Sequence, residues 1–363
     1  YYIAVAGNYE KAVETYRELV ENYPADNAGR NNLAIASFAM LDFDSALEQG
    51  REALDVYPKN EIMRSNLALY AMYAGEFETS RTEAEALLAD NPDYFTAWLP
   101  IAMAANASGD LPGAESAYAQ MASAGARGVS LSNLGLADLA LVRADAVAAR
   151  LALEQGIGID IESNNPRSAA IKRVMLAEAE ILAGNEAKAR EHLEDAIETA
   201  GLAIQVPAAL AYLSISDTGK AADIATEFGA SLNAQSRAYG MLIDALISLG
   251  EGDNIASIDQ LSAGLALADL WLLRYYRGMA YFEGGAYVEA LDEFRHCEQR
   301  IGEATAAFLD DLPTWRLTAL LPYWTARAEA ELGMQTDAAV NLERFVGYRQ
   351  AGPELEAAKD LLR

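Results

Sequence analysis

A step of 34 residues recurs at four independent positions in the N-terminal part of the chain. One position carries proline, one mainly aromatic residues, one small residues and one mainly glycine. The four sets are Pro24, Pro58 and Pro92; Tyr9, Phe43, Phe77 and Leu111; Ala12, Ala46, Ser80 and Ala114; and Gly7, Leu41, Gly75 and Gly109. Composition alone does not produce four sets with one period, so we expect a repeated structural unit of this length.

Each unit is predicted to contain two helices joined by a tight turn. In the second unit, apolar and small residues recur at helical spacing over about Ala28 to Met40 and again over Asp44 to Val56. The glycine position suits left-handed backbone at the end of the first helix. The aromatic position is expected to fill the seam between the helices, and the small position to let their axes approach closely. The proline position is expected to end the second helix.

A 34-residue unit that carries glycine, an aromatic residue, alanine and proline in this order resembles the tetratricopeptide repeat. The resemblance implies an all-α, right-handed superhelical solenoid of about ten helix pairs with a C-terminal capping helix. Because one helix pair cannot bury its apolar face alone, we expect an elongated stack held by contacts between adjacent repeats. The predicted parts of this single solenoid are regular repeats over 1–126 (the first truncated), degenerate repeats with insertions over 127–346 and a cap over 347–363.

The degenerate part departs from the period at four places. Ala144 stands where glycine is usual, and a short insertion is predicted from Ile159 to Pro166. Residues 203–228 are interpreted as a compressed seventh repeat. A capping helix is predicted over Leu355 to Leu362, begun by Pro353.

The charge of the chain limits its partners. Asp and Glu number 54 against 27 Lys and Arg, which gives a formal net charge of −27. Such a field repels nucleic acid and anionic membrane surfaces, although a simply solvated surface explains it as well. No apolar run approaches the ~18 residues of a membrane-spanning helix, so no direct insertion is expected. Because Tyr1 falls inside a predicted helix, we expect a soluble fragment of a longer protein, with a membrane-tethered protein as one alternative.

The residues offer little for catalysis, and no catalytic, cofactor-binding or metal-binding residue is assigned. His192 and His296 lie in different repeats, and Cys297 is the single cysteine. Gly156-Ile157-Gly158 lacks the third glycine of a dinucleotide loop, so a helix end and loop is predicted there. Asp310-Asp311 could ligate a metal, but an acidic loop or helix cap is the favoured interpretation. We therefore expect no enzyme in this chain.

The tetratricopeptide resemblance implies that ligands contact a few fixed positions on the first helix of each repeat. At two of these positions, family members that clamp a terminal carboxylate carry Lys and Asn. The clamp is not supported here, because these positions hold Asn31 and Ile35, then Ser65 and Leu69. The candidate partner-binding residues are Asn31, Ile35, Phe38, Leu69, Met72, Tyr73, Leu99, Met103, Asn106, Tyr275, Met279 and Phe282.

This lining is mainly apolar, which suits an amphipathic helix or an extended hydrophobic protein segment. If it takes such a segment, Phe38, Tyr73 and Met103 are expected to be accessible to solvent. Two alternatives stay open: the same residues form core, or the superhelix encloses a small molecule or lipid.

A narrower resemblance lies in the C-terminal third. The segments that carry it are Trp271 to Arg274, Gly278 to Tyr281, Phe308 to Thr314 and Leu321 to Trp324. They are similar to the tetratricopeptide region that follows the catalytic domain of bacterial eukaryotic-like serine/threonine kinases. This implies a sensing, docking or scaffolding role in a bacterial signalling protein whose catalytic domain lies outside this sequence.

Overall fold

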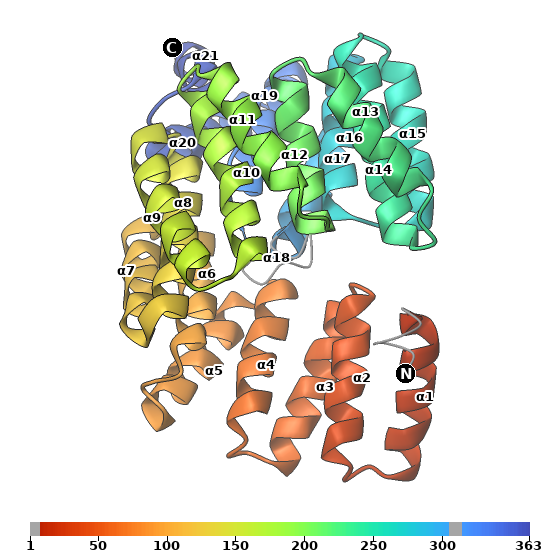
Figure 1. Ribbon diagram of the computed structural model, residues 1–363. Coiled ribbons are helices and arrows are strands. Elements are labelled where there is room, and N and C mark those ends of the chain that lie inside the picture. The colour runs from red at the N-terminus through yellow and green to blue at the C-terminus, as the bar shows by residue number, and fades with distance from the viewer. Residues whose placement is uncertain (1–7, 305–313) are drawn as a thin grey trace. The chain divides into compact units, whose positions relative to one another are not determined.

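The computed structural model describes residues 8–304 and 314–363, and the chain divides into two compact units, Tyr1–Gly128 (unit 1) and Val129–Arg363 (unit 2). Throughout the described residues the secondary structure is helical, and no strand occurs among them (Figure 1). Consecutive helices pack as pairs, and within each unit neighbouring pairs contact one another. The predicted all-α fold of stacked helix pairs is confirmed.

Unit 1 begins with a single helix and continues with three helix pairs. Its helices are α1 (Tyr9–Asn22), α2 (Asn27–Ala39), α3 (Phe43–Val56), α4 (Glu61–Tyr73), α5 (Phe77–Asp90), α6 (Trp98–Ala107) and α7 (Leu111–Met121), with short 3₁₀ turns at Phe95–Ala97 and Ala122–Ala124. Helix α8 (Gly125–Arg143) spans the boundary between the units.

The glycine and proline positions of the 34-residue period lie at helix ends in unit 1, as predicted from the sequence. Gly75 and Gly109 have φ of +80° and +79°, the left-handed backbone that ends the first helix of a pair, while Gly7 lies outside the described residues. Helices α3 and α5 end two residues before Pro58 and Pro92.

The small position lies at the closest helix contacts. Ala46 and Ala114 are fully buried, and the buried Ser80 hydroxyl donates to the Ala68 carbonyl oxygen at 2.8 Å. A larger side chain at this position would push the two helices of a pair apart.

Unit 2 continues the paired arrangement to the C-terminus. Its helices after α8 are α9 (Ala146–Glu162), α10 (Pro166–Leu182), α11 (Glu186–Ile197), α12 (Leu202–Ser214), α13 (Thr218–Gly229), α14 (Ala234–Gly250), α15 (Asn254–Leu267), α16 (Trp271–Glu283), α17 (Tyr287–Gln299), α18 (Ile301–Ala304), α19 (Leu321–Glu331), α20 (Gln335–Tyr348) and α21 (Pro353–Leu361). A 3₁₀ turn at Arg316–Thr318 precedes α19.

Several irregular features of this part agree with the prediction. Residues 203–228 form the pair α12 and α13, and the predicted cap is α21, which packs against α20. Ala144 has φ of +58°, so it adopts the left-handed conformation despite its Cβ.

Two predictions around residue 160 are wrong. Helix α9 runs through the predicted Gly156-Ile157-Gly158 loop and reaches Glu162, so the predicted insertion reduces to Ser163–Asn165. The physical reason is a buried lysine on α10. A Cβ on Gly156 would lie 2.6 Å from Lys172 Cε, so the missing side chain makes room for Lys172 inside the helix pair.

Lys172 is fully buried, and its ammonium group lies within an all-protein cluster. Its Nζ donates to Asp160 Oδ2 at 2.6 Å and to the Ser130 and Ser168 hydroxyl oxygens at 2.9 Å each. Ser130 in turn donates to Asp160 Oδ1 at 2.6 Å. The cluster joins α8, α9 and α10, so a charged network takes the place of apolar packing there.

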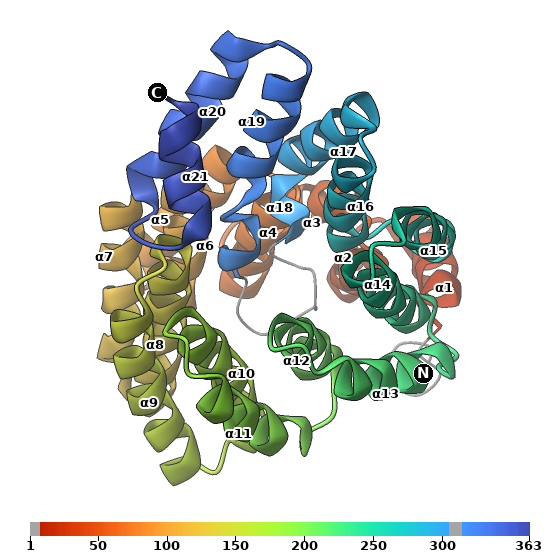
Figure 2. The same cartoon turned by 90° about the horizontal axis from the view of Figure 1, so that it is seen from above.

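Unit 2 also departs from the expected elongated stack, because its last repeats return to its first helix. The Gln350 amide donates to the Arg143 carbonyl at 2.8 Å, and Arg349 Nη1 donates to the carbonyls of Leu141 and Val142 at 3.2 and 3.1 Å. In Figure 2 the helices of unit 2 follow one another around a ring. The expectation of an elongated stack is therefore wrong for this unit, although adjacent repeats do contact one another.

Among the described helices, none combines the length and the apolar composition needed to cross a membrane.

Candidate functional site

The predicted partner-binding residues differ in exposure. Those that are buried are Met72, Tyr73, Leu99, Met103, Asn106, Tyr275 and Phe282. Those that keep part of their surface in solvent are Asn31, Ile35, Phe38, Leu69 and Met279. The expected accessibility of Tyr73 and Met103 is wrong.

Packing within unit 1 explains why these two side chains are withdrawn from solvent. The Tyr73 ring stacks on Phe43 with centroids 5.6 Å apart, and Phe38 lies 4.9 Å from it. Met103 Sδ accepts from the Tyr118 hydroxyl at 3.3 Å. Both residues therefore belong to the core between helices.

Exposure falls from α2 to α6 at equivalent positions of the repeat. Ile35 is 36% exposed, Leu69 is partly exposed and Met103 is fully buried, although the three are spaced by 34 residues. Ile62, which is 64% exposed, lies seven residues before Leu69 and so on the same side of α4. The accessible apolar surface of this face is therefore on α2 and α4.

The three candidates from the C-terminal part lie on α16. Tyr275 stacks on Trp271 at 5.4 Å, and Phe282 lies beneath the guanidinium of Arg327 at 4.3 Å from the ring centre. Only Met279 keeps part of its surface in solvent. These residues serve the packing of α16 against its neighbours.

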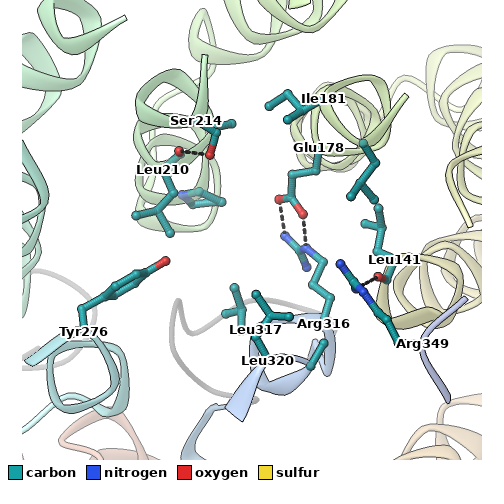
Figure 3. A pocket seen from close by; sticks show the side chains of 14 residues that line it. Leu141, Glu178, Ile181, Leu210, Ser214, Tyr276, Arg316, Leu317, Leu320 and Arg349 are labelled. Carbon is teal, nitrogen blue, oxygen red and sulfur yellow. Dashed lines mark hydrogen bonds and ion pairs between the residues drawn. The ribbon is translucent and has the colours of Figure 1, made fainter. Parts of the chain in front are cut away.

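Unit 2 contains a cavity of about 280 Å³ on its inner side, and none of the predicted partner-binding residues lines it (Figure 3). Helices α8, α10, α12 and α16 contribute to its wall, together with the segment after residue 313 and the turn after α20. The lining residues are Leu141, Glu178, Ile181, Leu182, Pro207, Leu210, Ala211, Ser214, Tyr276, Arg316, Leu317, Ala319, Leu320 and Arg349.

Arg316 forms the charged side of this cavity. Its Nε and Nη2 donate to the two oxygens of Glu178 at 2.7 and 3.0 Å, a two-pronged pair, and its Nη1 donates to Thr314 Oγ1 at 2.5 Å and to Asp138 Oδ1 at 3.4 Å. Although burial by itself lowers the pKa of the guanidinium, Glu178 and Asp138 raise it above its ordinary value. Arg316 is therefore a permanent cation held between two carboxylates.

Asp138 fixes the backbone of the same segment. One carboxylate oxygen accepts from the Trp315 amide at 2.6 Å, and the other accepts from the Thr314 hydroxyl and from the Arg316 amide at 3.3 Å. Asp138 itself is buried on α8. The side chains of α8 and α10 thus hold residues 314–316 against the inner side of unit 2.

Two further polar side chains line the cavity. Burial lowers the pKa of the Arg349 guanidinium, with an opposing effect of Glu354, and its Nη1 is bound to the two α8 carbonyls. Burial, helped by the nearby Glu178 carboxylate, raises the pKa of Tyr276 to about 12, so its hydroxyl keeps its proton at neutral pH. Figure 3 shows this hydroxyl pointing into the cavity.

The residues considered for chemistry in the sequence are not brought together. His296 Nδ1 lies 2.9 Å from the Asp292 carbonyl oxygen of its own helix. Cys297 is buried against Trp271, and burial raises the pKa of its thiol well above the usual value. Within the described residues, no three His, Cys, Asp or Glu side chains are grouped to hold a metal ion. Asp310-Asp311 lies outside the described residues.

Sequence reasoning missed Asp138, Glu178 and Arg316. Asp138 is the single acid in the apolar stretch Ala137 to Val142, and Glu178 shares the mainly apolar stretch Val174 to Leu182 with Glu180. An isolated charge on the core side of a helix indicates a buried partner, and that signal was readable. The identity of the partner was not, because Arg316 lies 178 positions from Asp138.

Comparison with known families bears on unit 1. A family model described as tetratricopeptide repeat matches residues 4–61 and 65–129. The matched residues are similar to this repeat. The 34-residue period, the left-handed glycines and the proline ends are thus the features of that repeat, and the resemblance predicted from the sequence is confirmed for this part of the chain.

Several solved structures are similar to this chain. A tetratricopeptide repeat protein from Parabacteroides merdae is 18% identical, with 66% of this chain and 93% of that chain covered and a TM-score of 0.48. The Cut9–Hcn1 structure of the APC/C is 12% identical, with 99% of this chain and 59% of that chain covered and a TM-score of 0.48. Human IFIT1 with PPP-AAAA is 14% identical, with 96% of this chain and 83% of that chain covered and a TM-score of 0.48. No curated protein matches the sequence.

Proposed function

We propose that this chain is a non-catalytic interaction module whose unit 1 binds an amphipathic protein segment on the first helices of its early repeats. Tetratricopeptide arrays generally mediate protein–protein contacts through such faces. The observation that carries the proposal is the apolar surface of Ile35, Ile62 and Leu69, which stays accessible while the equivalent Met103 is core.

The chemistry of the segment follows from this surface and from the charge of the chain. Exposed isoleucine and leucine on two neighbouring helices suit a helix that presents apolar residues at i, i+3, i+4 and i+7. The formal net charge of −27 favours basic residues on the remaining sides of that segment and disfavours nucleic acid.

Selection from a displayed peptide library on the full chain tests the proposal. We expect enriched peptides with helical apolar spacing and flanking Lys or Arg. In titrations with one such peptide, Ile35→Glu and Leu69→Glu should each weaken binding at least tenfold, because the new carboxylate faces apolar side chains (~1.4 kcal/mol per tenfold). Val56→Glu is the matched control, since Val56 is 45% exposed on a second helix of a pair.

The control also sets the outcome that contradicts the proposal. If Val56→Glu weakens binding as much as Ile35→Glu, or if neither variant has an effect, the peptide does not bind on the α2 and α4 face. Thermal unfolding of each variant separates a lost surface from a lost fold.

We further propose that the array belongs to a bacterial signalling protein and recruits partners for an attached output domain, such as a serine/threonine kinase. The support is the similarity of the C-terminal third, including Trp271 to Arg274 and Leu321 to Trp324, to kinase-associated arrays. The coding sequence next to this segment tests it. An encoded catalytic domain with H-R-D and D-F-G motifs supports the proposal, and a different neighbouring domain contradicts it.

The alternative, enclosure of a small molecule by the helices, has one observation in its favour. It is the cavity of unit 2, and it does not involve the unit 1 surface.

A further inference from the structure

We propose that the cavity inside unit 2 binds a small uncharged molecule with a compact apolar body and one carbonyl oxygen, such as a ketone. Every described residue that lines it belongs to unit 2. The inference is therefore independent of the peptide surface on unit 1, and either proposal can fail without the other.

The apolar body of the ligand is inferred from the side chains that line the cavity. Most of the lining is aliphatic: Leu141, Ile181, Leu182, Pro207, Leu210, Ala211, Leu317, Ala319 and Leu320. A cavity of ~150 Å³ lined by such residues is enough to bind benzene. At about 280 Å³ the cavity of unit 2 accommodates a ring with a short side chain.

The oxygen atom of the ligand follows from Tyr276. Its hydroxyl points into the cavity, and within the described part of the chain it has no hydrogen-bond partner (Figure 3). It is protonated at neutral pH and is therefore a donor. A carbonyl oxygen in the cavity would accept this bond while the rest of the ligand fills the apolar space.

The absence of charge on the ligand follows from the partners of Arg316 and from the net charge of the chain. Each guanidinium nitrogen of Arg316 already has a protein acceptor, and two carboxylates face this one cation. Arg349 Nη1 donates to two carbonyls, whereas its Nε is buried with no hydrogen-bond partner in the described part of the chain, and burial lowers the pKa of this guanidinium. Because Glu178 and Asp138 already outnumber the Arg316 charge and the chain has a net charge of −27, a carboxylate ligand is disfavoured, and Arg349 Nε is left as a second donor for the carbonyl oxygen.

Three probes of nearly equal size separate these requirements: acetophenone, cumene and benzoate. Calorimetric titration of the full chain should show acetophenone binding about threefold or more tighter than cumene, because only the ketone accepts a hydrogen bond. Benzoate should bind at least tenfold more weakly than acetophenone. Failure of both acetophenone and cumene to bind, or tighter binding of benzoate, overturns the proposal.

Two tyrosine variants test the role of the hydroxyl. Tyr276→Phe should reduce the affinity for acetophenone to the level of cumene and leave cumene binding unchanged. Tyr281→Phe on the same helix, outside the cavity lining, should change neither. Equal weakening of both probes by Tyr276→Phe would mean that the residue only shapes the cavity and would overturn the hydrogen bond.

A third variant tests the location. Ser214 is exposed at the end of α12 and lines the cavity, so Ser214→Trp should fill space there with little effect on folding. We expect at least a tenfold loss of affinity for acetophenone and cumene. Unchanged binding of both probes would place their site elsewhere and overturn the assignment to this cavity.

Discussion

Unit 1 and unit 2 are built from the same kind of helix pair, but different contacts hold them together. In unit 1 the hydrogen bonds between repeats join residues of neighbouring repeats. One example runs from Asn66 Nδ2 to Asn31 Oδ1 at 3.0 Å, across 35 positions of the sequence. In unit 2, Asp138 and Glu178 bind a segment 138 to 178 positions away, and Arg349 reaches the end of α8 across 207 positions or more. Repetition alone therefore accounts for unit 1, whereas unit 2 also needs a small number of distant polar contacts.

The difference has a thermodynamic consequence. In a stack with neighbour contacts only, each repeat adds its own stability and that of one interface. Distant contacts couple the first and last repeats, so the loss of one bond affects many helices. Unit 2 is expected to unfold as a more cooperative body than unit 1.

The largest effect is expected from Arg316→Met. This change removes the cation that Asp138 and Glu178 share. Removing one partner of a buried ion pair lowers the free energy of unfolding by about 3–5 kcal/mol. Hydrogen exchange followed by mass spectrometry should show lost protection in α8, α10 and α19 while α2 to α5 are unchanged.

The control for this variant is Arg81→Met, which breaks an exposed ion pair with Glu85 in unit 1 and should leave protection unchanged in both units. If Arg316→Met loosened only α19, the distant contacts would be incidental and the proposed cooperativity of unit 2 wrong.

A smaller effect is expected at alkaline pH. The folded-state pKa of Tyr276 is raised to about 12, above the ordinary value of 10.0, so the native state holds a proton that the unfolded chain releases. The stability from this group is present below pH 10 and declines as pH rises toward 12, by roughly 2–3 kcal/mol in full. Tyr276→Phe should make urea unfolding of unit 2 less sensitive to pH in this range. An identical pH profile for the two proteins would contradict this assignment.

The smallest effect is expected from overpacking a repeat in unit 1. Ala46 is fully buried between α2 and α3, so Ala46→Leu should lower the free energy of unfolding by ~1–3 kcal/mol. Glu48→Ala on the exposed side of α3 should be near neutral. Urea denaturation compares the two, and equal shifts of the midpoint would invalidate the alignment of the repeats.

Much of the fold could be predicted from the sequence because the determining interactions are local. Gly75, Pro58 and Ala46 each fix a turn, a helix end or a close contact within one repeat, and their spacing is visible without a structure. The wrong predictions concern residues whose partners lie on another helix. Gly156 suggested a loop, because glycine is common where helices end. The residue that explains this glycine is Lys172 on the next helix, which occupies the space left by the missing side chain.

The candidate site was less predictable for the same reason. Whether Ile35 or Met103 faces solvent depends on what packs around each helix, and the two occupy equivalent positions in the repeat. The cavity of unit 2 depends on Tyr276, Arg316 and Arg349, which no sequence period connects.

The return of Gln350 and Arg349 to the end of α8 also bears on how such a chain changes in evolution. Open arrays gain and lose whole repeats by duplication and deletion, since a new unit needs only two neighbours. In unit 2 an added helix pair would carry residues 349 and 350 away from the α8 carbonyls that they bind. The number of repeats is thus fixed in unit 2, while the stack before it is free to grow or shrink.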